Sequence, residues 1–243
     1  PVQAELVGVL LTPSGSEQHF TSCVVVVHGM GGTGKTVTAV AAVQDTAVRR
    51  WLSEIYWLTV GADPVGERIK QLAAVLYKQL SGKSMKEEGQ DEHERQAMLV
   101  AAMADKQRAL VVLDDPWMPE QVRFLNPIDG SQQTEHRLLV TTRIRDLVPK
   151  ATRVELPLMG KDEAVALLLE LANVEEAAYL KEQPGSAWPP EAAYAIVAEC
   201  GLLPITLTIA AQVVRNWGSG WQESVLPLLR EDQGSGEGST STV

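Results

Sequence analysis

The stretch VVVVHGMGGTGKT, residues 24–36, decides the fold. Its four valines, residues 24–27, predict a buried strand, because β-branched residues on both faces are typical of a parallel sheet. The eight residues that follow His28, GMGGTGKT (29–36), match the pattern G-x-x-x-x-G-K-[ST]. A helical spacing of apolar residues begins at Thr36. A strand, a glycine-rich loop and a helix in this order predict a phosphate-binding loop at residues 29–36.

The residue types of this loop suit phosphate chemistry. Its glycines let the backbone turn sharply and keep side chains away from the phosphate oxygens. The freed N–H groups and the helix N-terminus would form an anion-binding nest. We expect Lys35 to reach the β- and γ-phosphates and the Thr36 hydroxyl to ligate Mg²⁺. The expected ligands are therefore ATP or ADP with Mg²⁺, bound by Gly29, Met30, Gly31, Gly32, Thr33, Gly34, Lys35, Thr36 and Val37.

A second candidate element is the apolar run LVVLDD, residues 110–115, which ends in two carboxylates. In an open parallel sheet, ligands bind beyond the carboxyl ends of the strands. This strand would therefore bring Asp114 and Asp115 to the same edge as the phosphate loop. We expect Asp114 to hold Mg²⁺, directly or through water, and Asp115 to orient or deprotonate the attacking water.

A third strand end carries a cation. The run LLVTTR, residues 138–143, places two hydroxyls and then Arg143 at the ligand edge of the sheet. A guanidinium there is suited to sensing a γ-phosphate through charge-assisted hydrogen bonds. Arg145 is a weaker alternative for the same role. The expected catalytic residues are thus Lys35, Asp115 and Arg143.

The remaining pattern alternates strands and helices up to residue 156, which favours an α/β fold with a parallel sheet. The later segments are helical only. We expect a nucleotide-binding domain at residues 1–156, a small helical domain at 157–230 and a disordered Gly- and Ser-rich tail at 231–243. The expected strands are residues 24–27, 55–60, 109–113, 137–141 and 152–156. The longer expected helices are residues 36–51, 64–80, 94–107, 161–173, 190–200 and 204–217.

Composition narrows the class of protein. Of the 243 residues 45% are hydrophobic, which is ordinary for a globular chain, and the net charge is −10. Such an acidic balance argues against nucleic acid as a partner. The two cysteines follow no metal-ligand spacing, no apolar run reaches the ~18 residues of a membrane span, and no signal peptide opens the chain. We expect a cytoplasmic protein and, because the chain does not begin with Met, a fragment of a longer one.

These motifs together resemble the NB-ARC group of STAND nucleotide switches, which includes plant disease-resistance proteins and apoptotic protease-activating factors. The resemblance extends over residues 7–229. Besides the three strand ends, the second of which reads LVVLDDPW (110–117) with its trailing Trp117, it rests on YWLTV (56–60), on the segment 156–171 and on GLLP (201–204). The group's pattern has Arg-Glu after the Val7-Gly8 pair, where this chain has Val9-Leu10. The sequence also carries no winged-helix, MHD-like or repeat segment after GLLP. We expect either a nucleotide core taken from a longer protein or a protein without those parts.

The resemblance implies further properties. The fold would be a P-loop NTPase three-layer sandwich with a parallel five-stranded sheet in the order 2-3-4-1-5, followed by a small ARC1-like helical domain. Pro204 would pack against the adenine, with Val7 on its other side. A Pro at this position is also a common helix start. Other domains or copies of the full-length protein would be the partners.

Several functions are compatible with these residues. The leading hypothesis is an ADP/ATP-binding switch of a defence or cell-death signalling protein, in which slow ATP hydrolysis resets the switch. An AAA+-like ATPase with higher turnover, acting in an oligomer, is the main alternative. A small-molecule kinase would need a lid rich in Arg, and the sequence contains no cluster of Arg residues that could form one. A vestigial nucleotide site is disfavoured because every phosphate-facing residue type is present.

Overall fold

The computed structural model describes residues 2–12, 23–63, 66–85, 91–128 and 134–234. The chain divides into two compact units, residues 1–156 and 157–243. The first contains a parallel five-stranded sheet in the order β2-β3-β4-β1-β5, which confirms the predicted fold and strand order. Its strands are β1 (Val24–His28), β2 (Glu54–Thr59), β3 (Ala109–Asp114), β4 (Arg137–Thr142) and β5 (Thr152–Glu155).

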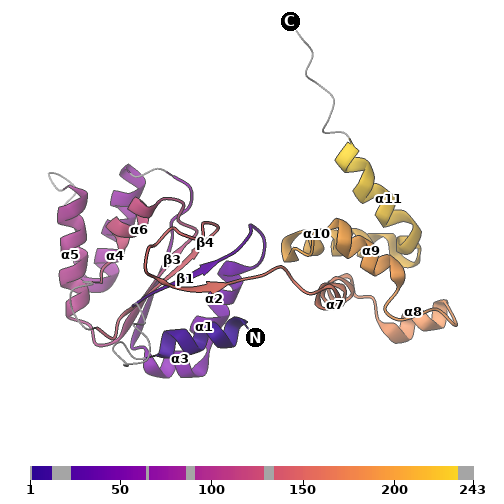
Figure 1. Ribbon diagram of the computed structural model, residues 1–243, viewed down its shortest axis with the longest axis horizontal. Coiled ribbons are helices and arrows are strands. Elements are labelled where there is room, and N and C mark those ends of the chain that lie inside the picture. Colours follow the sequence, from indigo (N-terminus) through magenta and orange to yellow (C-terminus); the bar gives the residue numbers. More distant parts are fainter. Residues whose placement is uncertain (1, 13–22, 64–65, 86–90, 129–133, 235–243) are drawn as a thin grey trace, which may run out of the picture. The chain divides into compact units, whose positions relative to one another are not determined.

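Helices cover both faces of this sheet (Figure 1), which makes three layers. The strand side chains alternate between two hydrophobic clusters, as the pleat of a strand requires. Val24 and Val26 of β1 belong to one cluster, while Val25 and Val27 belong to the other. One face carries α4 (Glu67–Ser81), α5 (Glu92–Ala104) and α6 (Pro119–Leu125), and the other carries α1 (Val2–Leu11), α2 (Lys35–Gln44) and α3 (Thr46–Trp51).

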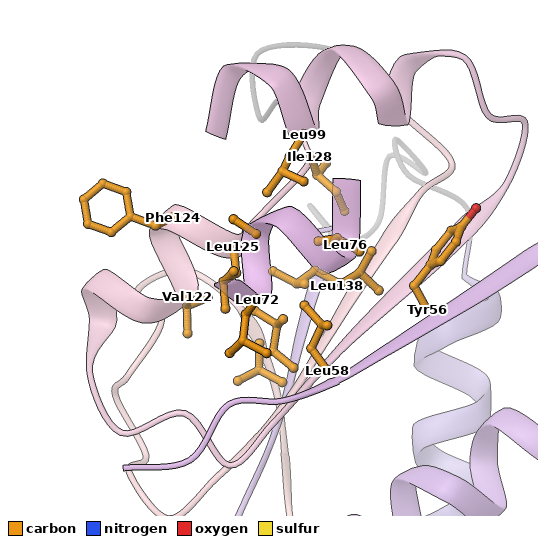
Figure 2. Close-up of a cluster of buried hydrophobic side chains, with 14 of the residues drawn as sticks. Tyr56, Leu58, Leu72, Leu76, Leu99, Val122, Phe124, Leu125, Ile128 and Leu138 are labelled. Atoms are coloured by element: carbon orange, nitrogen blue, oxygen red, sulfur yellow. The ribbon is translucent and has the colours of Figure 1, made fainter. Parts of the chain in front are cut away.

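Figure 2 shows the first of these clusters, where helix and strand side chains meet. Leu72 and Leu76 of α4 lie four residues apart, one helical turn, and both point into the cluster. They meet Leu58 of β2 and Leu138 of β4 there. Burial on this face fixes the strands, and with them the positions of the strand ends where the polar residues lie.

Two helices replace the single helix that we predicted for residues 36–51. Asp45 has an extended ψ of 137° and ends α2. Its side chain accepts a hydrogen bond from the backbone N–H of Ala47 at 2.8 Å and so caps α3. An Asp side chain competes in this way with the continuous helical ladder. Short helix α6 and the N-terminal helix α1 were not predicted either.

Helix α1 offers a test of stability. Gly8 is exposed in this helix, and a Cβ added there would meet nothing within 4 Å. Gly8→Ala is therefore expected to raise the free energy of unfolding by about 0.5–1 kcal/mol, through the lower conformational entropy of the unfolded chain. Urea unfolding measures the change. An unchanged unfolding midpoint would mean that α1 does not form part of the folded unit, and a lower one would mean that the added methyl group is not accommodated there.

The second unit is helical. Its members are α7 (Lys161–Ala172), α8 (Glu176–Glu182), α9 (Glu191–Glu199), α10 (Pro204–Trp217), the short 3₁₀ helix η1 (Gly218–Gly220) and α11 (Trp221–Gly234). Trp221 and Val225, one turn apart on α11, are buried in its core. Helix α11 continues through residues 231–234, which we predicted as disordered, because the Gly- and Ser-rich run begins only at its last residue. The rest of that predicted tail, residues 235–243, lies outside the described residues. No helix in the described ranges is both long and apolar enough to cross a membrane.

Candidate nucleotide-binding site

The loop after β1 turns back on itself and leads directly into α2. Gly32 and Gly34 have φ angles of 82° and 94°, in the left-handed region that favours glycine. The Thr33 hydroxyl donates a hydrogen bond to the Met30 carbonyl at 2.9 Å and closes the turn. Gly34 immediately precedes Lys35, the first residue of α2. The loop thus has the strand–loop–helix arrangement that phosphate binding requires.

Lys35 is a buried cation at the base of this loop, with 8% of its surface exposed. Its ammonium donates hydrogen bonds to the carbonyls of Gly29 at 2.9 Å and Met30 at 2.7 Å. Burial lowers the pKa of the Lys35 ammonium, Arg143 lowers it further, and Asp115 and Asp114 oppose the shift. An anion in the loop would favour the charged ammonium, so the pocket is electrostatically suited to a phosphate.

Asp114, the last residue of β3, joins this loop to the centre of the sheet. One of its carboxylate oxygens accepts hydrogen bonds from Thr36 Oγ1 at 2.7 Å and from Thr141 Oγ1 at 2.6 Å. The parallel register pairs Asp114 with Thr141, which explains the second contact. Magnesium prefers oxygen ligands and usually takes one or two from the protein. The Thr36 hydroxyl and the Asp114 carboxylate are such a pair, so these residues fit the ion.

Asp115, Arg143 and Trp117 form a second polar group beside the loop. Arg143 Nε lies 3.7 Å from a carboxylate oxygen of Asp115, and Trp117 Nε1 donates to the other oxygen at 3.2 Å. A Cβ built on Gly31 would lie 3.1 Å from Arg143 Nη1, so the guanidinium lies against the phosphate loop. Asp115 has a φ of 55°, and its N–H is bonded to the backbone carbonyl and hydroxyl of Thr141. The predicted sensor and the predicted catalytic carboxylate are therefore direct neighbours.

The other predicted nucleotide-binding residues lie as follows. Met30 in the loop and Val37 on α2 are exposed, at 60% and 72%. Val7 is on α1, where its partly buried side chain packs against the hydrophobic cluster of that face of the sheet. Pro204 is the first residue of α10, in the helical unit. Contacts of Val7 and Pro204 with an adenine stay predictions.

Sequence reasoning missed the roles of Thr141, Trp117 and Gln121. Buried Gln121 accepts hydrogen bonds from the backbone N–H groups of Trp117 and Met118, at 2.7 and 2.9 Å. Its amide nitrogen donates to the carbonyl of Gly61, beyond β2, at 3.1 Å. Gln121 therefore ties the segment after Asp115 to the neighbouring strand end. Two of the three had a signal in the sequence: Thr141 stands in the run that ends at Arg143, and Trp117 ends the LVVLDDPW stretch (110–117) that resembles the family's acidic strand.

A parallel sheet in this order, with a G-x-x-x-x-G-K-T loop after β1 and a carboxylate at the end of β3, defines a P-loop NTPase. The NB-ARC domain model matches residues 5–178, and the chain belongs to this family. The resemblance that the motifs indicated is thereby confirmed, and with it a nucleotide-binding domain.

Three curated relatives are similar over most of the chain. Regulatory protein AfsR of Streptomyces coelicolor is 31% identical over 233 residues, 94% of this chain and 22% of the relative. Apoptotic protease-activating factor 1 of Danio rerio is 26% identical over 81% of this chain and 15% of its own length. Disease resistance protein ADR1 of Arabidopsis thaliana is 26% identical over 89% of this chain and 23% of the relative. The chain thus spans less than a quarter of each relative.

Proposed function

We propose that this chain is the nucleotide switch of a cytoplasmic signalling protein of the defence or cell-death type. ADP would favour a closed state and ATP an open one, and slow ATP hydrolysis would reset the switch. Relatives named as a regulatory protein, an apoptotic protease-activating factor and a disease resistance protein support a regulatory role. Their greater length supports other domains, or further copies of the full-length protein, as partners.

One observation carries the proposal: the Arg143 guanidinium lies between Gly31 of the phosphate loop and the carboxylate of Asp115. A ligand shifts a two-state equilibrium only by its different affinity for the two states. Only ATP offers a γ-phosphate to this guanidinium, so Arg143 would supply that difference. A cation that distinguishes the two nucleotides is what a switch needs.

The other residues would bind and react as follows. Loop N–H groups and Lys35 hold the β- and γ-phosphates, and Thr36 and Asp114 hold Mg²⁺, which supplies charge neutralisation for the phosphates when bound. Asp115 accepts a proton from water as that water attacks the γ-phosphorus, and ADP leaves. Because the Asp115 carboxylate is already paired with Arg143, it is less available to accept a proton from water. This supports slow rather than fast turnover of ATP. Val7 and Pro204 are proposed to contact the adenine.

The sensor role predicts a selective loss. Arg143→Ala removes a charge-assisted contact with the γ-phosphate, worth about 1.5–3 kcal/mol, so affinity for ATP should fall about 10- to 100-fold. Affinity for ADP should stay within about twofold, since ADP has no group at that position. Titration calorimetry with ADP and a non-hydrolysable ATP analogue, both with Mg²⁺, measures the two constants.

Arg145→Ala is the matched control, because Arg145 is also exposed and lies two residues further along the same segment. It should change neither constant. Equal losses for ADP and ATP in Arg143→Ala would remove its role as a γ-phosphate sensor. A selective loss in Arg145→Ala would transfer that role to Arg145.

The proposed function is tested by denaturing the purified protein and identifying any released nucleotide by chromatography. Stoichiometric ADP, with turnover well below about 1 per second, is the result expected of a switch that retains its product. Turnover in the ordinary enzymatic range of about 1–10³ per second would favour the AAA+-like alternative instead. A protein that contains no nucleotide and binds neither ATP nor ADP with Mg²⁺ would contradict both.

A further inference from the structure

Trp117 touches both members of the Asp115–Arg143 pair. Its indole N–H donates to Asp115 Oδ2 at 3.2 Å, and the Arg143 guanidinium carbon lies 5.1 Å from the centre of its ring. One aromatic side chain therefore holds the carboxylate through its edge and the guanidinium through its face. The second contact has cation–π geometry.

The backbone around Trp117 is fixed from two neighbouring strands. Gln121 accepts from the Trp117 N–H and reaches back to the β2 end through the carbonyls of Gly61 and Asp63. On the other side, the Thr142 hydroxyl at the end of β4 donates to the Pro116 carbonyl at 2.9 Å. The indole is thus presented at a defined position, although 40% of Trp117 is exposed.

Burial in a hydrophobic core does not account for this placement, because Trp117 is exposed. In the part of the chain that the structure describes, Trp117 belongs to none of the three hydrophobic clusters. Its contacts go to a charged pair beside the phosphate loop instead. Asp115 keeps a left-handed backbone conformation, in which its N–H donates to the carbonyl and the hydroxyl of Thr141.

We propose that Trp117 is a positioning residue that holds Arg143 against the phosphate loop and fixes the orientation of the Asp115 carboxylate. The inference rests on the proposed function of the site. A free arginine side chain has high rotamer entropy, which binding of a γ-phosphate would have to overcome. Stacking on Trp117 restricts the guanidinium before a γ-phosphate binds. The hydrogen bond from the indole N–H likewise restricts the Asp115 carboxylate, which is proposed to accept a proton from the attacking water.

Two substitutions separate these contacts. Trp117→Phe keeps an aromatic face for Arg143 and removes the hydrogen bond to Asp115, whereas Trp117→Leu removes both. The Leu variant should lose about fivefold of the preference for ATP over ADP, with ADP affinity within about twofold of wild type. The Phe variant should keep that preference within about twofold, while turnover falls about threefold. Calorimetry with ADP and a non-hydrolysable ATP analogue, and phosphate release under single-turnover conditions, measure both quantities.

Trp217→Leu is the matched control, because Trp217 is similarly exposed, at 49%, and lies in the helical unit. It should leave both quantities unchanged. An unchanged ATP preference in Trp117→Leu overturns the proposal, and so does a rise, which would make Trp117 a latch that withholds Arg143. Equal losses of preference in the Phe and Leu variants also overturn it, since the ring face would then play no part. Each of these outcomes contradicts the role of Trp117 alone, because the wild-type protein still binds nucleotide. A wild-type protein that binds neither nucleotide would contradict the proposed function itself.

Discussion

Lys35→Ala is expected to weaken the binding of both ADP and ATP by about 30-fold or more. Removing one partner of a buried, hydrogen-bonded charge pair costs about 2–5 kcal/mol or more, and each 1.4 kcal/mol is a factor of ten in the dissociation constant. Lys35 is buried, and its Nζ lies within the loop that would enclose the phosphates. Titration calorimetry with each nucleotide and Mg²⁺ measures the loss.

The folded state of this variant should be intact. Because burial already lowers the pKa of Lys35, the fold disfavours the charged ammonium before a phosphate arrives. Thermal unfolding without nucleotide should therefore give a midpoint within a few degrees of wild type. Lys161→Ala, which removes an exposed lysine at the start of α7, is the control and should bind both nucleotides normally. Unchanged affinity in Lys35→Ala would refute the assignment of the phosphate loop.

The central strands and the phosphate loop could be predicted from sequence because their signals are local. Four consecutive valines favour a strand because β-branched side chains pack well in a sheet, and the loop requires its glycines, Lys35 and Thr36 at fixed spacing. The positions of Asp114 and Asp115 at the end of β3 followed from a general rule, that parallel strands present their carboxyl ends at one edge. Each of these inferences needed a single stretch of chain.

The contacts between strand ends could not be predicted in the same way. The Thr141 hydroxyl meets Asp114 only because the register of β3 and β4 pairs these two positions. The Asp115–Trp117–Arg143 group depends on the left-handed φ of Asp115 and on buried Gln121, neither of which leaves a pattern in the sequence. Helices α6 and α8 have seven residues each, too few for a hydrophobic period to be recognised.

Val7 shows how little a two-residue match says about local structure, although its contact with an adenine stays a prediction. Two residues, Val7 and Gly8, were interpreted as a segment beside the adenine. In the structure they lie inside α1, whose Leu6 and Leu10 are buried one turn apart against the sheet. The apolar spacing of residues 6 and 10 was the stronger signal, and it predicts a helix.

Gly29→Ala is expected to destabilise the first unit by about 3 kcal/mol, which for a domain of this size lowers the unfolding midpoint by about 6–12 °C. A Cβ on Gly29 would lie 2.5 Å from the backbone carbonyl oxygen of Leu156, closer than real Cβ atoms approach. Leu156 cannot recede easily, because its N–H is bonded to the His28 carbonyl at 2.8 Å and β5 pairs with β1 just before it. Calorimetric or fluorescence-detected thermal unfolding measures the shift.

Gly31→Ala distinguishes this backbone collision from a general intolerance of the loop to side chains. The three atoms nearest to a Cβ on Gly31 all belong to the Arg143 guanidinium, the flexible end of a half-exposed side chain, and the nearest lies at 3.1 Å. Because that group can move, the unfolding midpoint should fall by no more than a few degrees, while displacement of Arg143 should reduce the preference for ATP over ADP. Equal destabilisation in the two variants would mean that the loop backbone, rather than contact with Leu156, requires glycine at both positions. A Gly29→Ala variant as stable as wild type would mean that the end of β5 yields to the loop, and would contradict the predicted collision with Leu156.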